Sequence, residues 1–292
     1  MSRKHPIISV TGSSGAGTST VMNALQHIFQ RVGAQAAFIE GDSFHRYNRA
    51  EMKKQLKAAK KEGRNLSHFG PEGNLFDKQL ELFRSYGESG TGMHRHYIHN
   101  ENEAVLYNGT PGTFTEWEPI PTGTDLLFYE GLHGGASTDE IDLAAEVDLL
   151  IGVAPTINLE WIQKINRDTS ERGYSREVVM DVIYRRMHDY MHYIVPQFSR
   201  THINFQRIPM IDSSNPFEVR DIPTADQSVV LIHFLKNQPS IEHKLHLRGL
   251  IEGSQITGFN TLVIPGGKMT YAMELILTER ILDLMRERGR LD

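Results

Sequence analysis

The stretch Ile7-Ile8-Ser9-Val10-Thr11-Gly12-Ser13-Ser14-Gly15-Ala16-Gly17-Thr18-Ser19-Thr20 decides the fold that this sequence predicts. Its apolar first residues predict a strand, and the residues from Thr18 to about Val32 predict a helix. The glycines between them let consecutive backbone N–H groups turn toward an anion, and the helix N-terminus behind them adds a favourable dipole. The stretch therefore predicts a phosphate-binding loop, in which all residues from Gly12 to Thr20 contact a nucleotide. A Gly/Ser-rich turn without function is the alternative.

One position departs from the usual pattern of such a loop. The pattern G-x-x-x-x-G-K-[ST] is met except that Thr18 stands in the place of the lysine. Ser19 is then the hydroxyl expected on Mg²⁺, unless it serves only as a helix N-terminal residue. Because transfer of a phosphoryl group is slow without a positive charge at the phosphates, another cation must replace the lysine.

Candidates for that cation lie in the segment from Asn158 to about Arg172, which predicts a helix. On a helix, Lys164, Arg167, Asp168 and Arg172 are spaced i, i+3, i+4 and i+8 and share one face. Such a face can close over the phosphates of a nucleotide. The alternative is a solvated helix with a Lys164–Asp168 ion pair worth a few tenths of a kcal/mol.

Two carboxylates follow apolar runs that predict strands. Asp42 follows Ala36–Ile39, and Glu130 follows Leu126–Tyr129. Ligands of such sheets gather at the carboxyl ends of the strands. We therefore expect Asp42 to accept the proton of an attacking hydroxyl and Glu130 to orient Mg²⁺ or its waters. As turn or cap residues, these carboxylates would need no function.

Basic and histidine-rich segments offer contacts for an anionic substrate. His45 and Arg49 follow Asp42 and could bind a phosphate together, although a solvated basic loop is the alternative. The segment His94-Arg95-His96-Tyr97-Ile98-His99 contains an H-x-H-x-x-H spacing. We predict no metal site there, because the sequence shows no acidic partner for these histidines.

Along the chain, short apolar runs alternate with helical stretches, which predicts an α/β fold with a mixed, mostly parallel sheet flanked by helices. No repeat or linker indicates a boundary, so we expect one domain over residues 1–292. The stretch from about 65 to 123 is rich in Gly, Pro, His and Asn and predicts a loop-rich substrate or lid insertion. Further strands are predicted at Ile7–Val10, Leu149–Val153, Ile208–Ile211, Val229–Phe234 and Thr261–Ile264, and further helices at Ala50 to about Glu62, Arg176 to about Tyr193 and Met269–Arg288.

Composition excludes several classes of protein. The 292 residues carry 31 Lys+Arg against 36 Asp+Glu, a net charge of −5, which argues against a general nucleic-acid or membrane-surface binder. Without cysteine, the chain has no disulfide, thiolate-zinc site or cysteine nucleophile. There is no apolar run long enough to span a membrane and no export signal, so we expect a cytoplasmic protein.

With these motifs in hand, the sequence resembles the shorter bacterial branch of the phosphoribulokinase family. The resemblance runs through Glu40-Gly41-Asp42-Ser43-Phe44-His45-Arg46, Phe128-Tyr129-Glu130-Gly131-Leu132-His133-Gly134 and Val263-Ile264-Pro265-Gly266-Gly267-Lys268, and Thr18 is typical of that branch. It implies transfer of the ATP γ-phosphoryl group to the C1 hydroxyl of D-ribulose 5-phosphate, with Mg²⁺. It also implies a homo-oligomer, often activated by NADH and inhibited by AMP.

The same resemblance assigns roles to single residues. It implies that Asp42 is the catalytic base, Glu130 the Mg²⁺-side acid and Lys164 the contact to the transferred phosphoryl group. Other residues take supporting roles by the same resemblance: Arg167, Asp168 and Arg172 on the active-site helix, His45, Arg49, Tyr97 and His99 as substrate contacts, and Arg186 as an arginine tied to allosteric response, or else a surface charge.

Three other functions stay open at this stage. A related small-molecule kinase acting on uridine or pantothenate has a similar loop, but its substrates lack the phosphate that His45 and Arg49 would hold. A GTPase-type switch would need an N-K-x-D string, which is absent. A catalytically silent relative would have no reason to keep Asp42, Glu130 and Lys164 together.

Overall fold

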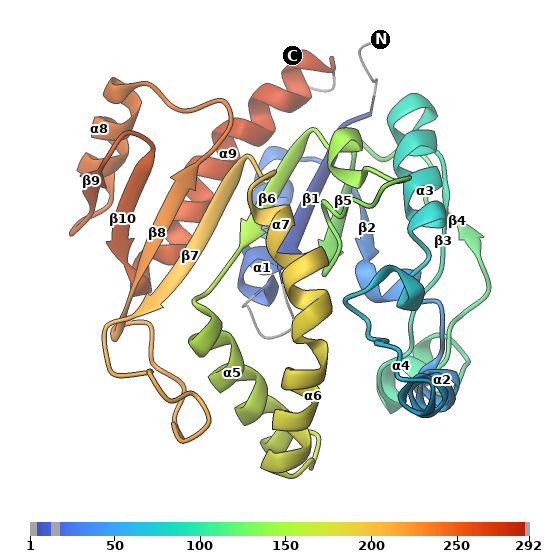
Figure 1. Ribbon diagram of the computed structural model, residues 1–292. Helices are drawn as coiled ribbons and strands as arrows, with labels where there is room; N and C mark the ends of the chain where they lie inside the picture. Colours follow the sequence, from blue (N-terminus) through green and yellow to red (C-terminus); the bar gives the residue numbers. More distant parts are fainter. Residues whose placement is uncertain (1–4, 13–17, 290–292) are drawn as a thin grey trace.

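The computed structural model describes residues 5–12 and 18–289, without the side chains of residues 18–20, and is built around one eight-stranded sheet (Figure 1). The strand order is β2-β5-β1-β6-β7-β8-β10-β9. The first five strands in this order pair in parallel, whereas β8, β10 and β9 continue the sheet with antiparallel pairs. This confirms the predicted α/β class with a mixed, mostly parallel sheet.

The strands of the large sheet have the following bounds: β1 Ile7–Gly12, β2 Ala36–Glu40, β5 Leu126–Gly131, β6 Leu149–Val153, β7 Ile203–Pro209, β8 Ser228–Phe234, β9 Gln255–Thr257 and β10 Thr261–Pro265. A second sheet consists of β3 (Met93–His94) and β4 (Glu118–Pro119).

The helices follow the strands in the order expected for crossover connections. Their bounds are α1 Thr18–Val32, α2 Arg49–Lys61, α3 Phe76–Ser89, α4 Glu101–Leu106, α5 Ile157–Ser170, α6 Arg176–Asp189, α7 Val195–Phe198, α8 Ile241–Leu250 and α9 Met269–Glu287. A π-helical turn, Tyr190–Ile194, joins α6 to α7.

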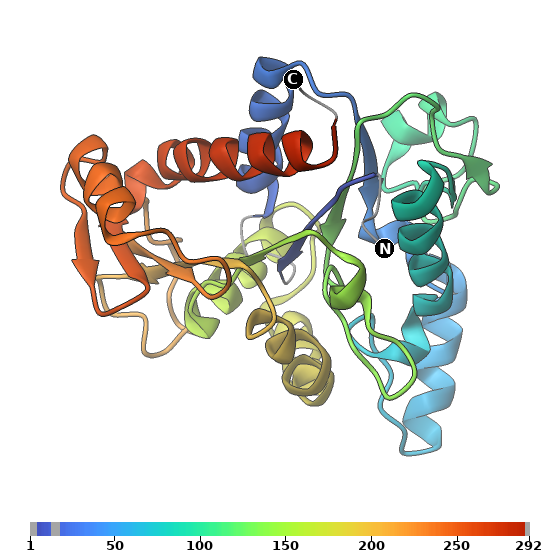
Figure 2. The same ribbon diagram turned by 90° about the horizontal axis from the view of Figure 1, so that it is seen from above.

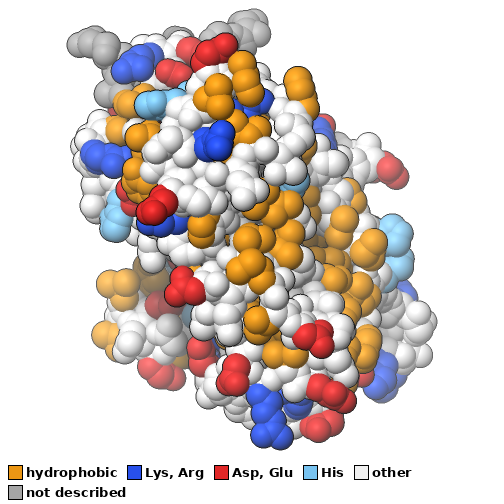
Figure 3. Space-filling view, turned by 90° about the vertical axis from the view of Figure 1, so that its left-hand side faces the viewer, with side chains coloured by type: hydrophobic (Ala, Val, Ile, Leu, Met, Phe, Trp, Pro, Cys, Tyr) orange, Lys and Arg blue, Asp and Glu red, His pale blue; other side chains and the backbone are white. Residues whose placement is uncertain are grey.

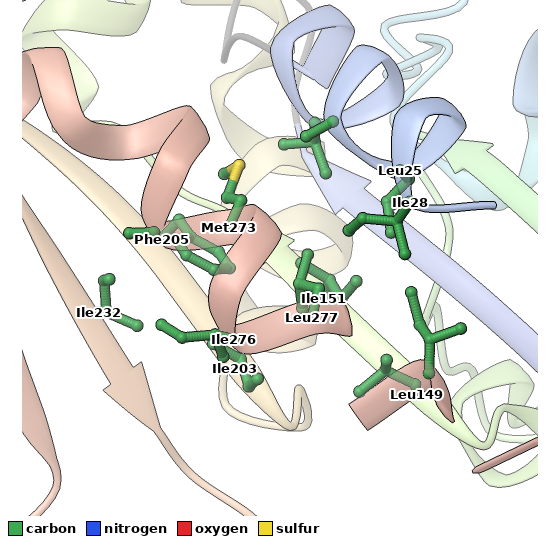
Figure 4. Close-up of a cluster of buried hydrophobic side chains, with 14 of the residues drawn as sticks. Leu25, Ile28, Leu149, Ile151, Ile203, Phe205, Ile232, Met273, Ile276 and Leu277 are labelled. Carbon is green, nitrogen blue, oxygen red and sulfur yellow. The ribbon is translucent and has the colours of Figure 1, made fainter. Parts of the chain in front are cut away.

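Helices cover both faces of the sheet, as the view from above shows (Figure 2). Helices α1 and α9 pack on one face, where Leu25 and Ile28 meet Met273 and Leu277 over the strands (Figure 4). On the other face α3 packs against β1, with Phe83 and Tyr86 fully buried. Each fully buried large apolar side chain contributes about 1.5–3 kcal/mol, so these two layers hold the strand ends in fixed positions.

The structure differs from the sequence-based expectation in several elements, including the short elements β3, α4, β4, α7 and β9, which were not predicted. Helix α3 lies inside the stretch 65–123 that was predicted to be loop-rich. The strand predicted at Ile208–Ile211 is instead β7, which begins five residues earlier, at Ile203. Helix α8 was not predicted. Within the described residues, no helix is both long and apolar enough to cross a membrane.

Candidate active site

The parallel strands of the sheet end on one edge, and the predicted site residues lie there (Figure 1). Strand β5 lies between β1 and β2, with Glu130 level with Val10 on one side and Glu40 on the other. The chain after β2 makes one 3₁₀ turn that contains Asp42. The fold therefore brings Glu130 and Asp42 to the end of β1, next to the predicted phosphate-binding loop.

Two glycines allow the ends of β2 and β5 to approach each other closely. A Cβ atom on Gly41 would lie 2.9 Å from the Cα of Gly131 and 2.6 Å from the Tyr129 hydroxyl, and a Cβ on Gly131 would lie 2.8 Å from the Cα of Gly41. Only glycine fits at both positions. The turn with Asp42 is thus held against the end of the strand that carries Glu130.

Two histidines face the carboxylate of Asp42. The Nε2 atom of His45 lies 3.6 Å from one carboxylate oxygen, and the Nε2 atom of His99 lies 3.9 Å from the other. The Asp42 side chain is 39% exposed, so a small molecule can reach it. His99 comes from a segment distant in sequence, as does Tyr97, whose ring lies 6.3 Å from that of His45. Predicted substrate contacts from two segments therefore meet at the predicted base.

Two further histidines, which the sequence analysis did not select, lie behind His45. The ring of His68 is 4.1 Å from the His45 ring, and His133 Nε2 lies 2.9 Å from the His68 carbonyl oxygen. Burial lowers the pKa of His45 to about 3 and that of His133 to about 4, and burial also lowers the pKa of His68. These three rings are therefore neutral at pH 7 and carry no positive charge of their own near Asp42.

A hydrogen-bond network fixes this histidine group. The side-chain amide of Asn74 donates to the carbonyls of His68 and Gly70. Asp189 accepts from Asn65 and Ser67, in each case at 2.6 Å, which ties the loop around His68 to the end of α6. Buried hydrogen bonds of this kind favour one arrangement of the loop.

Arg49 and Arg95 connect the segments that carry His45 and His99 through hydrogen bonds to backbone carbonyls. Arg49 donates to the carbonyl of His99 at 3.0 Å and is exposed. Arg95 donates to the carbonyls of Ser43 and His45, and its guanidinium lies 3.6 Å from the centre of the Phe114 ring. Such a stacked guanidinium is held by cation–π attraction as well as by hydrogen bonds.

The cations predicted on one helix face converge on the carboxylate of Asp168, although α5 ends at Ser170 and Arg172 lies in the turn that follows it. Lys164 hydrogen bonds to Asp168, Arg167 lies 3.0 Å from it and Arg172 3.3 Å. Burial acts to raise the pKa of Asp168, but the hydrogen bond from Lys164 and the charges of Lys164 and Arg167 together lower it. Burial lowers the pKa of Lys164, and its neighbours Arg186 and Arg167 lower it further. The helix starts after β6, at the same edge as Asp42.

Arg186 lies on α6 with its guanidinium 5.3 Å from the centre of the Phe69 ring. Burial is the main reason that its pKa falls to about 10, so it is not a solvated surface charge. Its positive charge also lowers the pKa values of His45, His68 and Lys164. The side chain therefore belongs to the electrostatic surroundings of the site, a position that the sequence left open.

The structure thus brings together the predicted residues outside the glycine loop. The side chains predicted to contact nucleotide at positions 13–20, Ser19 on Mg²⁺ among them, lie outside the described residues. Glu130 carries a carboxylate at the end of β5, and oxygen donors of this kind are what Mg²⁺ prefers, so the described donors fit that ion.

Comparison with known proteins identifies relatives over the full length. The Phosphoribulokinase / Uridine kinase family matches residues 7–214. The chromosomal phosphoribulokinase of Cupriavidus necator is 56% identical over 291 residues, which cover 99% of each chain, and a probable phosphoribulokinase of Escherichia coli is 55% identical over 98% of each.

A solved structure agrees with these matches. The structure of phosphoribulokinase from Rhodobacter spheroides superposes with a TM-score of 0.89 at 50% sequence identity. The match covers 98% of this chain and 99% of the Rhodobacter chain. Both the whole sequence and the whole fold are therefore shared. The chain belongs to the phosphoribulokinase / uridine kinase family, as the motifs at its strand ends predicted.

Proposed function

We propose that this chain is an ATP-dependent kinase that phosphorylates D-ribulose 5-phosphate at its C1 hydroxyl and releases ribulose 1,5-bisphosphate and ADP. The observation that carries the proposal is the meeting of Asp42 with His45 and His99 at the strand edge where α5 presents its cations. The matching of bacterial phosphoribulokinases over nearly the whole chain supports the same substrate.

Asp42 is the proposed base. Its carboxylate takes the proton of the C1 hydroxyl while the C1 oxygen forms a bond to the γ-phosphorus. The bond from that phosphorus to the β,γ-bridging oxygen breaks, and its electron pair leaves with ADP. The rings of His45 and His99 lie beside the carboxylate of Asp42. Because the low pKa of His45 keeps its ring neutral, His45 places no positive charge there that would weaken Asp42 as a base.

Lys164 is the proposed replacement for the lysine that the glycine loop lacks. In the structure it is buried and paired with Asp168, which also holds Arg167. Asp168 balances these cations in the absence of nucleotide and orients them toward the phosphates when ATP is present. A preorganised charge of this kind stabilises the transferring phosphoryl group more than one that must move from water.

Glu130 and Ser19 are the residues proposed to hold Mg²⁺, which when bound with ATP neutralises phosphate charge. Arg49, His45, Tyr97 and His99 are proposed to bind the sugar phosphate, with Arg167 and Arg172 nearby. The whole chain is proposed to form one domain, whose residues 65–123 form the substrate wall. ATP is then bound by the loop and substrate by the wall, on either side of Asp42.

The first prediction concerns the substrate. Purified protein with ATP and Mg²⁺ should form ribulose 1,5-bisphosphate from ribulose 5-phosphate, and uridine and pantothenate should give no product, because neither carries a phosphate for His45 and Arg49. Mass spectrometry of the products identifies them. The panel is run with and without NADH and AMP, the proposed effectors. Phosphorylation of uridine or pantothenate instead would contradict the proposed substrate.

The second prediction concerns the base. Asp42→Asn should lower kcat by roughly 10²–10⁴-fold, because the amide cannot accept the hydroxyl proton. ATP binding, measured by calorimetry, should stay unchanged. Glu40→Gln is the matched control. The Glu40 carboxylate also lies 4.0 Å from His99, but Glu40 is the last residue of β2, paired with β5, and does not lie in the turn that carries Asp42. Equal losses in the two variants would argue against Asp42 as the base.

The third prediction concerns Lys164. Lys164→Met should lower kcat by about 10²–10³-fold with a smaller change in KM for the sugar phosphate, because the charge acts on the transferring group. Lys78→Met is the control, since Lys78 lies on α3, forms an exposed i,i+3 ion pair with Glu81 and is not one of the candidate site residues. A kcat close to the unaltered value in Lys164→Met would show that another cation replaces the missing lysine.

A homo-oligomer is proposed from the surface around α8 and β9. Figure 3 views the molecule from that side and shows hydrophobic side chains gathered over the face. The exposed apolar residues there include Leu235, Ile241, Leu245, Leu250 and Phe259, which is 80% exposed. Strand β9 is the last strand of the sheet, and unprotected edges and large apolar surfaces are usually covered by another chain.

The fourth prediction tests this surface. Light scattering should give a mass that is a multiple of the 33.2 kDa chain. The double variant Leu245→Asp, Phe259→Asp should lower that mass, because two carboxylates would have to be buried in the contact. Leu106→Asp is the control, as Leu106 is 73% exposed on α4, away from this face. A monomer in the unaltered protein would refute the proposal.

A further inference from the structure

A group of metal-ligating side chains lies on the small sheet β3–β4. His94 is paired in register with Glu118 on the neighbouring strand, and His96 follows His94 by two residues. In an extended segment, side chains two residues apart point to the same side. The Glu118 carboxylate oxygen lies 3.7 Å from His94 Nε2 and 3.6 Å from His96 Nε2, and the ligand atoms of all three residues lie within 4.8 Å of one another.

The surroundings hold these rings in place. His94 is buried, and the His96 ring stacks on the Tyr107 ring with centres 4.4 Å apart. The backbone of His96 is bonded in both directions, because its N–H donates to the Thr115 hydroxyl at 2.9 Å and its carbonyl accepts from the Thr115 N–H at 2.9 Å. A site whose donors are already oriented binds a metal with little loss of conformational freedom.

We propose that His94, His96 and Glu118 bind one divalent transition-metal ion of the zinc class. Ligand atoms around tetrahedral zinc lie about 3.3 Å apart, from bond lengths of roughly 2.0–2.2 Å. The two observed distances to Glu118 need only a few tenths of an ångström of adjustment. Two imidazoles and one carboxylate suit zinc rather than Mg²⁺ or Ca²⁺, which take oxygen ligands. Glu118 is 56% exposed, so water can complete the coordination.

The sequence analysis rejected this site because no acidic partner was visible. The partner is Glu118, which lies 22 residues beyond His96 in the chain and reaches it only through the β3–β4 pairing. The alternative to a metal site is a pair of ordinary His–Glu contacts. That alternative leaves two imidazoles sharing one carboxylate oxygen, an arrangement in which a bound cation satisfies all three groups at once.

The ion would fix the position of the segment from His94 to His99 relative to Asp42, the proposed catalytic base. Because side chains alternate along the segment, Arg95 and Tyr97 point to the other side from His94 and His96. Arg95 donates to the carbonyl of His45, and the Tyr97 ring contacts the His99 ring at 4.9 Å. A metal that joins the histidines to β4 therefore holds the segment that presents these residues to Asp42.

The fifth prediction tests the site with Zn²⁺ itself. Untagged, metal-free, full-length chain is titrated with Zn²⁺ in excess Mg²⁺, which occupies oxygen-only sites. Calorimetry should give one Zn²⁺ per chain, and His94→Gln and Glu118→Gln should each weaken binding at least about tenfold. Glu118→Gln keeps the size of an exposed side chain, so loss of binding there does not reflect a failure to fold.

The control is a second close histidine pair, His188 and His192, whose rings stack with centres 4.2 Å apart. Asp189 contacts His188 at 3.2 Å, but within the described residues only His94, His96 and Glu118 form a group of three potential ligands with all ligand atoms within 4.8 Å of one another. The double variant His188→Gln, His192→Gln should bind Zn²⁺ as the unaltered chain does. Loss of binding in this variant, or unchanged binding in His94→Gln and Glu118→Gln, would overturn the proposal.

Hydrogen exchange tests the effect on the wall. Zn²⁺ should slow exchange of the amides of His96, Ile98 and Thr115, whose hydrogen bonds lie along the segment. The slowing should be absent in Glu118→Gln. Stoichiometric binding without slowing would overturn the role in holding the wall. None of these readouts uses catalysis, so a failure here is separate from a failure of the proposed kinase activity.

Discussion

Asp168 is the group on which the charge balance of the site depends. Its carboxylate is buried and accepts contacts from Lys164, Arg167 and Arg172. Without it, these three cations would repel one another in a region where burial already lowers the pKa of Lys164. Asp168 therefore keeps these cations assembled at one place. In the proposed function, this group distant in sequence supplies the positive charge that the loop lacks at Thr18.

On the opposite side of the site, the histidines behind Asp42 are neutral. Burial lowers the pKa values of His45, His68 and His133, and the positive charge of Arg186 lowers those of His45 and His68 further. A protonated imidazole at 3.6 Å would lower the basicity of Asp42, the proposed base. The same network of Asn74 and Asp189 that buries the histidines therefore preserves the base.

Most residues of the candidate site could be proposed from the sequence, because local patterns indicate them. The strand-loop-helix at the start of the chain, the carboxylates after β2 and β5, and the i, i+3, i+4, i+8 spacing on α5 can each be read without the fold. Helix α3 was missed because Gly, Pro and Asn around it mask its amphipathic face. His68 gives no local signal, and its position depends on Asn74 and Asp189, which lie on other segments. The partner Glu118 was missed for the same reason, since only the β3–β4 pairing brings it to His94.

The segments around β3 and β4 lie outside the main sheet, so side-chain contacts have to fix their position. Strands β3 and β4 contribute only two residue pairs, and Tyr97 pairs with Phe114 through one isolated bridge. So short a ladder cannot define the wall by backbone bonding. Arg95 takes that role, because it joins the Phe114 and Trp117 rings to the carbonyls of Ser43 and His45. The position of His45 beside Asp42 therefore depends on the hydrogen bonds that Arg95 donates to the backbone.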